Sequence, residues 1–396
     1  MSMDRPRLPA GIWALGLVSL FMDISSEMIH ALLPVFLVTV LGASTVTVGL
    51  IEGIGEATAA MAKLFSGWLS DRLGKRKLLT VIGYGLGALS KPLFALAATP
   101  SWVLVARFSD RVGKGIRGSP RDALVGDLTP SGMRGAAYGL RQSLDTVGAF
   151  AGPLLAMALM AAFAGDFRLV FWIAVVPGLI AVAILVFGVH EPAHLKAPPA
   201  ARQPIRLKDL GQLGTLFWGV VATGTVLTLA RFSEAFLILR AENVGLTVTL
   251  VPLVLVIMNL VYAGSAYPIG ALSDRFNRRA LLAAGCAVLI AADLVLAVGS
   301  DLPTVLIGVG LWGLHLGMTQ GLLIALVADA APEALRGSAF GIFHLITGLA
   351  TLMASMIAGS LWAAIGPAAT FCGGALFTAI GLVGIGKSAR RYQGGI

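Results

Sequence analysis

Charged residues are scarce in this sequence. Only 12% of its 396 residues are Asp, Glu, Lys or Arg, whereas an average soluble domain carries roughly 25%. Hydrophobic residues make up 57% of the chain. A soluble fold cannot hide that much apolar surface. The composition therefore excludes an ordinary soluble protein and predicts a chain that is embedded in a lipid bilayer.

Cysteine is also scarce, and one common motif is missing. The two cysteines, Cys286 and Cys372, both fall in apolar runs, which excludes a disulfide framework and a thiolate metal site. No nucleotide-binding loop of the form G-x-x-x-x-G-K-[ST] occurs. We therefore predict that the chain is not an enzyme, that it needs no cofactor, and that it does not use ATP by itself.

What the sequence does contain is a series of long apolar runs. Spans of ~20 apolar residues cross a bilayer core of ~30 Å. The pattern predicts an all-α membrane protein with twelve transmembrane helices, at residues 11–40, 46–69, 77–98, 101–122, 135–163, 168–189, 213–238, 246–272, 279–299, 302–327, 335–363 and 367–387.

The basic residues follow these spans in an alternating way. Every second loop is rich in Lys and Arg, and the loops between are short and nearly free of both. Because basic loops stay in the cytoplasm, both termini and the central linker are expected there. The net charge of +9 is then explained by orientation and not by nucleic-acid binding. The proline-rich segment 190–212 is predicted to link two halves, 1–189 and 213–396.

An internal repeat supports these two halves. The stretch Gly67–Leu79 recurs as Gly270–Leu282, with an offset of 203 between Asp71 and Asp274. A second pair, around Arg134 and Arg336, has an offset of 202. Tandem copies of this length predict two similar bundles.

The stretch Gly67–Leu79 resembles the loop between helices 2 and 3 of the major facilitator superfamily, with the signature G-x-L-[SA]-D-R-x-G-[RK]-[RK]. The resemblance implies twelve helices in two pseudo-symmetric six-helix bundles, a midplane cavity and alternating access. It also implies that this loop latches the outward-facing state. The alternative is a role in orientation only. The candidate latch residues are Gly67, Asp71, Arg72, Gly74, Lys75, Arg76, Asp274 and Arg275.

Ionisable residues inside the first predicted span indicate a functional site, because such groups are costly in a membrane. Asp23, Glu27 and His30 are spaced i, i+4 and i+7, so they share one helical face. Two carboxylates and an imidazole can carry protons or ligate a divalent metal. They can also pair with basic residues on neighbouring helices, and the sequence leaves these alternatives open.

The fourth span carries a basic stripe that includes Arg107, Asp110, Arg111 and Lys114. These cations must meet carboxylates, water or an anion, and the expected carboxylates are Asp23 and Glu27 of the first span and Asp145 of the fifth. The stretch from Arg111 to Gly115 resembles the superfamily motif R-x-x-x-G, whose arginine is implicated in proton coupling. The network is either part of the coupling machinery or purely structural. An i, i+4 pair between Arg141 and Asp145 is also predicted.

The fifth span contains Gly148-Ala-Phe-Ala-Gly152-Pro153, which resembles the antiporter motif G-x-x-x-G-P of the superfamily. A plain packing kink at Pro153 is the alternative. In the second half, polar and aromatic residues are candidates to line a substrate cavity or to pack between helices: Arg231, Glu234, Asn259, Trp312, His315 and Gln320.

Together these features predict a secondary active transporter. The sequence is similar to a prokaryotic, resistance-type subgroup of drug/proton antiporters, with D-x-x-S-E-M at Asp23–Met28 and G-K-G-x-R-x-x-P-R-D at Gly113–Asp122. This implies proton-coupled export of a small molecule or drug across the bacterial cytoplasmic (inner) membrane by a monomer. The alternative cargo is a divalent metal ion or an organic anion. A non-transporting sensor is disfavoured because no soluble signalling domain is recognised.

Overall fold

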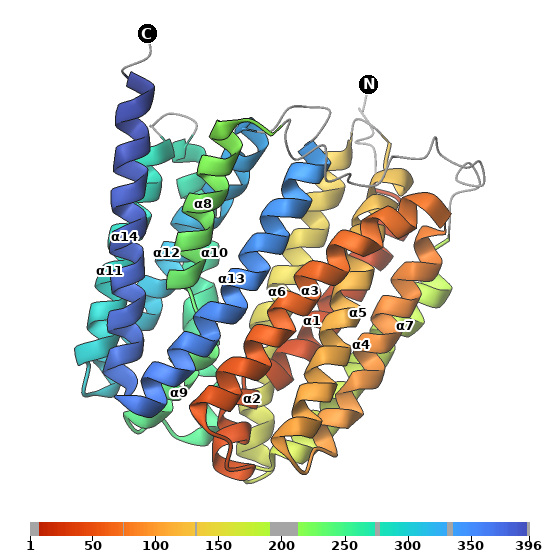
Figure 1. The fold of residues 1–396 in the computed structure, drawn as a ribbon. Coiled ribbons are helices and arrows are strands. Elements are labelled where there is room, and N and C mark those ends of the chain that lie inside the picture. Colours follow the sequence, from red (N-terminus) through yellow and green to blue (C-terminus); the bar gives the residue numbers. More distant parts are fainter. Residues whose placement is uncertain are drawn as a thin grey trace, which may run out of the picture. The chain divides into compact units, whose positions relative to one another are not determined.

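The computed structural model describes residues 8–73, 75–130, 133–190, 213–273, 278–330 and 336–393. These residues are almost entirely helical, and none of them lies in a strand (Figure 1). The prediction of an all-α protein with twelve spans is confirmed. Nine helical segments among the described residues are long and apolar enough to cross a membrane. The remaining three spans correspond to α3 (Thr45–Leu73), α5 (Pro100–Leu128) and α14 (Pro367–Gln393).

Helix starts follow from local capping chemistry. The side chain of Thr99 accepts a hydrogen bond from the backbone N–H of Trp102 at the start of α5, and Pro100 occupies the first turn. Asp166 caps α7 (Phe167–Gly188) in the same way. Asp301 caps α12 (Leu302–Ala330) by accepting from the backbone and hydroxyl of Thr304, and these hydrogen bonds hold the pKa of its carboxyl below the usual value.

The first predicted span is broken into three pieces. Helix α1 (Ala10–His30) ends four residues before Pro34 and is followed by α2 (Leu33–Val35) and a π-helix, η1 (Phe36–Val40). Pro34 has no N–H to donate to the carbonyl of His30, and its ring crowds that carbonyl. The break therefore places His30 at a helix end.

The seventh predicted span is also broken, without a proline. Helix α8 (Thr215–Ala230) and helix α9 (Ala235–Asn243) are separated by residues 231–234. At the break, the Ser355 hydroxyl accepts from the backbone N–H of Ser233, and the Ser233 hydroxyl accepts from the N–H of Ala235. Such side-chain bonds replace backbone bonds that a continuous helix would make.

The described chain forms two compact units, Met1–His30 with Thr58–Pro204, and Ala31–Ala57 with Ile205–Ile396. In the first unit, α1 packs against α6 (Arg134–Ala162) and α7, and α4 (Arg76–Ala95) packs against α5 and α7. Buried side chains of α1, α4, α5, α6 and α7 form an apolar core, which includes Ile12, Leu15, Tyr84, Val125 and Leu185.

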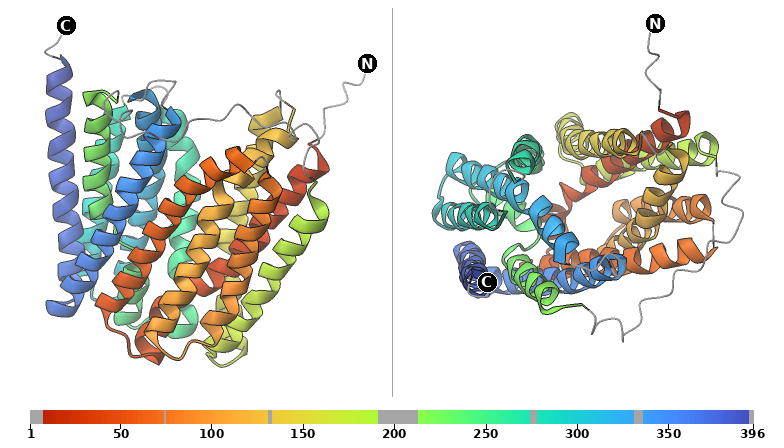
Figure 2. Two further views of the ribbon diagram at one scale, coloured as in Figure 1. Left: turned by 45° about the vertical axis from the view of Figure 1, so that its right-hand side comes forward. Right: turned by 90° about the horizontal axis from the view of Figure 1, so that it is seen from above.

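The second unit contains α10 (Leu253–Ser273), α11 (Arg278–Val298) and α13 (Arg336–Ala364) together with α8, α9, α12 and α14, and a 3-10 turn, η5 (Val248–Leu250). Helix α11 packs between α12 and α14, and α14 also contacts α8 and α13. Figure 2 shows α14 (dark blue) beside α11 (teal) and α8 (green). The predicted halves, 1–189 and 213–396, differ from these units at Ala31–Ala57, and the predicted linker lies mostly outside the described residues.

Candidate functional site

The acidic face of α1 forms one wall of the candidate site. Asp23, Glu27 and His30 lie on consecutive turns, and the Nδ1 atom of His30 is 3.3 Å from the Oε2 atom of Glu27. The side chains of Glu27 and His30 are 22% and 13% exposed. The sequence therefore placed the three groups on one face correctly, and they are largely withdrawn from solvent.

Two glycines of the antiporter-like motif press directly on this acidic face. A Cβ atom added at Gly148 of α6 would lie 2.7 Å from the Leu20 carbonyl oxygen and 2.9 Å from the Cβ of Asp23. A Cβ atom added at Gly152 would lie 2.8 Å from the Cβ of Glu27. Only glycine permits this approach of two backbones. The motif thus brings α6 against the acidic residues, with Pro153 buried beside Gly152.

The basic stripe of α5 supplies the opposite charge. The side chains of Arg107, Arg111 and Arg117 are buried. Arg111 and Lys114 act electrostatically on Glu27. Lys114 and Arg117 also attract the Asp23 carboxylate. Asp145, which carries a negative charge as Asp23 does, acts on it with the opposite effect. The acidic face of α1 and the basic stripe of α5 therefore lie within electrostatic range of each other.

Glycines on α5 allow neighbouring helices to approach the stripe. A Cβ atom added at Gly113 would lie 2.7 Å from the Gly83 carbonyl oxygen of α4, and one added at Gly115 would lie 2.3 Å from the Cβ of Ala62 in α3. Close backbones leave the long basic side chains little freedom. The Arg117 guanidinium accordingly stacks over the Tyr84 ring, 4.5 Å from its centroid, in a cation–π contact.

Lys91 is a buried member of the network that sequence reasoning missed. Its Nζ atom is 2.6 Å from the Oδ1 atom of Asp110 and donates to the Ser26 hydroxyl at 3.0 Å. The Lys91 and Asp110 side chains are 1% and 7% exposed. Asp110, predicted as a coupling residue, therefore sits in a buried ion pair. A lysine within the apolar run 77–98 was the signal that could have revealed it.

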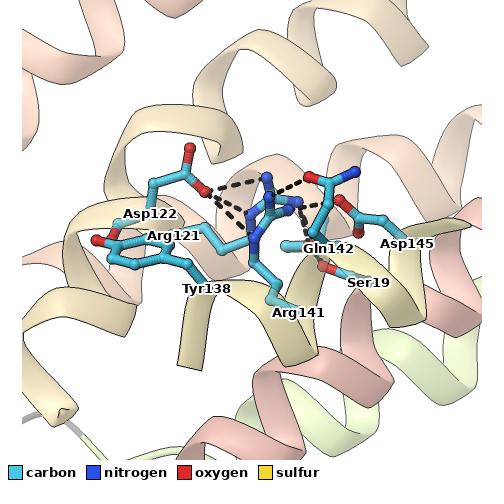
Figure 3. A network of polar contacts seen from close by, with 8 residues as sticks. Ser19, Arg121, Asp122, Tyr138, Arg141, Gln142 and Asp145 are labelled. Carbon is cyan, nitrogen blue, oxygen red and sulfur yellow. Dashed lines mark hydrogen bonds and ion pairs between the residues drawn. The ribbon is translucent and has the colours of Figure 1, made fainter. Parts of the chain in front are cut away.

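A further group of ion pairs joins α5 to α6, as Figure 3 shows. Arg121 pairs with Asp122 at 3.1 Å and donates to the Ser19 hydroxyl of α1. Arg141 pairs with Asp145 at 2.5 Å, so the predicted i, i+4 pair is present, and it also lies 3.9 Å from Asp122. The Tyr138 hydroxyl donates to the backbone carbonyl of Asp122. These contacts link Asp145 to the α5 stripe.

The predicted latch is described only in part. The Arg76 guanidinium pairs with the Asp127 carboxylate and donates to the Ala123 carbonyl at the end of α5. A Cβ atom added at Gly67 would lie 3.3 Å from the Ser119 side chain of α5, and Lys75 is exposed ahead of α4. The side chains of Asp71 and Arg72, and all of Gly74, Asp274 and Arg275, lie outside the described residues.

The cavity candidates of the second unit differ from one another in their surroundings. Trp312 is buried and packs on the Phe232 ring at 5.2 Å. His315 is buried, with Nδ1 2.8 Å from the Gly285 carbonyl oxygen. Gln320 is exposed and accepts a hydrogen bond from Tyr262. Partly buried positions are taken by Arg231 and Glu234, at the helix break, and by Asn259.

Two kinds of site are absent from the described residues. Within them, no group of three His, Cys, Asp or Glu side chains is placed to hold a metal ion. The described part of the second unit has no counterpart of the basic stripe, because the α12 positions equivalent to Arg107, Arg111 and Lys114 are Val309, Gly313 and Leu316. The charge network is therefore a feature of the first unit.

Membrane-spanning helices that repeat in tandem and bury a charge network define a multi-pass membrane transporter. Comparison with known proteins gives the family. The model of the Major Facilitator Superfamily matches residues 15–239 and 216–390, and the chain belongs to that family.

Relatives with close to full coverage include an uncharacterized MFS-type transporter of Methanocaldococcus jannaschii, 32% identical over 95% of this chain and 94% of the relative. Multidrug resistance protein MdtL of Klebsiella pneumoniae is 22% identical over 81% of this chain and 79% of its own length. Among solved structures, nucleoside transporter NupG shares the fold with a TM-score of 0.77, 13% identity and coverage of 94% of this chain and 98% of that one.

Proposed function

We propose that this transporter exchanges protons for a small molecule and exports that molecule from the cell by alternating access of its two halves. The proposal extends to a bacterial cytoplasmic membrane, with both termini in the cytoplasm and the monomer as the working unit. The alternation of basic and neutral loops supports this orientation.

One observation carries the proposal: Gly148 and Gly152 of the antiporter-like motif press on Asp23 and Glu27, on which the cations of α5 also act. An ionised Glu27 is compensated by His30, Arg111 and Lys114. When Glu27 accepts a proton, these cations lose a counter-charge and become available to another ligand. Proton and substrate then compete for one set of side chains, which is the requirement for exchange.

The contact between α6 and α1 also couples protonation of the two carboxylates to helix movement. Because α6 contacts α1 through glycine backbone, a small shift of α6 changes the surroundings of both carboxylates at once. Protonation and helix movement are thereby tied to each other within the first unit. The predicted latch, with Arg76 anchored to α5 through Asp127, is proposed to hold one end state until the proton moves.

A specific observation also favours an anionic cargo as the second candidate. Arg107, Arg111 and Arg117 are buried together on α5. A cluster of guanidinium groups attracts an organic anion and can bind its carboxylate through pairs of parallel hydrogen bonds. A divalent metal cargo is less well supported, since the described residues hold no group of three suitable ligands.

The test uses inverted membrane vesicles whose interior is acidified by respiration and monitored with a pH-sensitive dye. Hydrophobic drugs, organic anions and divalent metals are added in turn. We expect one class to release protons from the vesicles and to accumulate inside. Accumulation of a cargo without proton release, in vesicles shown to contain the folded protein, would contradict proton antiport and leave uniport or another coupling ion.

A further inference from the structure

Asp293 is a fully buried carboxyl group in a membrane-spanning helix, α11, five residues before that helix ends. It lies on α11 with 0% exposure, and neither of its oxygen atoms has a hydrogen-bond partner among the described residues. An ionised carboxylate without a partner inside a membrane-spanning helix is strongly destabilising. Sequence reasoning did not select it, because a single Asp in the run 279–299 showed no motif. The site described above does not use it.

The surroundings of Asp293 contain a second hydrogen-bond acceptor. A Cβ atom added at Gly374 of α14 would lie 2.7 Å from the Asp293 Oδ2 atom, 3.1 Å from the Phe232 ring and 3.2 Å from the Ala230 carbonyl oxygen. These three groups therefore border the same small space. Ala230 is the last residue of α8, where carbonyl groups lack donors from a following turn. Two acceptors therefore lie near the same point, and the described residues supply no hydrogen-bond donor to Asp293.

The repeat shows how unusual this position is. Helices α5 and α12 begin and end 202 residues apart, and the same offset relates Asp293 to Lys91 and Trp312 to Asp110. In the first unit, Lys91 and Asp110 form an ion pair at 2.6 Å. In the second unit, the position of Asp110 is taken by Trp312, whose ring packs on Phe232. The second unit thus keeps one ionisable group and lacks its partner.

Other ionisable groups around α11 are engaged elsewhere. The Arg240 guanidinium of α9 donates to the carbonyl oxygens of Leu296 and Gly299. His315 of α12 is bound to the Gly285 carbonyl, two turns before Asp293. Further described ionisable groups on or near these elements are Arg231 and Glu234 at the helix break, Cys286 on α11, the exposed Cys372 on α14, Asp301 at the start of α12 and His344 on α13. None of them forms an ion pair or a hydrogen bond with Asp293.

We infer that Asp293 is a proton-binding site, whose carboxyl carries a proton and donates it to the Ala230 carbonyl at the end of α8. The proton supplies the donor that both acceptors need, and it removes a charge for which the second unit offers no counter-ion. Loss of the proton places a negative charge next to the Ala230 carbonyl oxygen and α14, and drives these helices apart. This goes beyond the proposed exchange site, which lies in the first unit.

The test compares the purified protein with Asp293→Asn in lipid nanodiscs by infrared spectroscopy. The carbonyl stretching band of a protonated carboxylic acid is followed from acidic to alkaline pH, in normal and heavy water. We expect Asp293→Asn to lose one such band that persists at neutral pH in the unchanged protein. Asp301→Asn, which alters an exposed carboxylate at a helix start, is the matched control and is expected to lose none.

Thermal unfolding provides a second readout. Unfolding exposes Asp293 to water, where it ionises, so the melting temperature of the unchanged protein is expected to fall as pH rises. In Asp293→Asn that part of the fall disappears, because the amide donates to Ala230 at every pH. If Asp293→Asn does not fold, Asp293→Ser offers a smaller donor for the same comparison. Identical bands in Asp293→Asn and Asp301→Asn would overturn the inference, as would stabilisation by sodium that requires Asp293.

Discussion

The ion pair between Lys91 and Asp110 allows a quantitative prediction about the first unit. Asp110→Asn removes the carboxylate that lies 2.6 Å from the Lys91 ammonium. The ammonium is then left with the Ser26 hydroxyl, in a region that also contains Arg107, Arg111 and Arg117. Removing one partner of a buried pair costs about 3–5 kcal/mol. We expect Asp110→Asn to lose about that much stability.

The reverse change is expected to cost less. Lys91→Met leaves the Asp110 carboxylate with the Arg111 guanidinium, whose Nε atom is 4.0 Å away, so the remaining charge keeps a counter-ion. We expect a loss of about 1–3 kcal/mol, the cost of leaving one buried group poorly satisfied. The double variant removes both charges, and its loss is expected to be smaller than the sum of the two single losses.

The assay is reversible unfolding in mixed micelles, followed by circular dichroism for the two single variants and the double variant. Asp166→Asn is the control, because Asn also caps a helix and Asp166 lies outside the buried network. A double loss that equals the sum of the single losses to within about 0.5 kcal/mol would show that the two side chains are not coupled. It would refute the assignment of a buried ion pair.

Three further predictions follow from individual contacts. Gly152→Val forces side-chain atoms into the Glu27 Cβ, so transport is expected to fall at least tenfold at equal membrane level in an uptake assay. Gly139→Val on the same helix is the control, because an added Cβ there meets nothing within 4 Å. This variant is expected to keep most of the transport activity. Arg76→Gln removes the partly buried pair with Asp127 and is expected to cost up to about 1 kcal/mol in unfolding measurements. A loss above about 3 kcal/mol there would mean a different role. Asp301→Ala is expected to lower the melting temperature at neutral pH. Because the Asp301 pKa lies below its usual value, the difference in melting temperature between the two proteins is expected to vanish as pH falls through that pKa. A difference that persists in acid would contradict the capping role.

Much of the helical framework was predictable because it depends on local chemistry. The apolar runs alone placed most helix ends to within a few residues, and capping groups such as Thr99 and Pro100 fix those ends in the structure. The i, i+4 pair of Arg141 with Asp145 needed only helical geometry. The expectation that the acidic residues of α1 lie near the basic residues of α5 had a different basis. Buried cations require carboxylates, and the first span contains two.

The features that sequence reasoning missed depend on contacts between distant segments. The end of α1 is explained by Pro34, although it was not predicted from the sequence. The break at residues 231–234 involves no proline or glycine and is stabilised in part by Ser355 of α13. Lys91 and Asp293 each stand alone in an apolar run, so neither belonged to a recognisable pattern. Their meaning comes from what faces them: Asp110 in one repeat, and a helix end in the other.

The most direct test of the proposed exchange mechanism concerns Glu27. Proton release is measured in energised inverted vesicles with the cargo class that the unchanged protein responds to. Glu27→Gln, which keeps the shape of the side chain but cannot exchange a proton, is compared with Asp166→Asn at equal membrane level. The mechanism predicts that Glu27→Gln abolishes cargo-driven proton release and that Asp166→Asn retains it. Full proton release by Glu27→Gln would contradict the assignment of the α1–α5 network as the site of exchange.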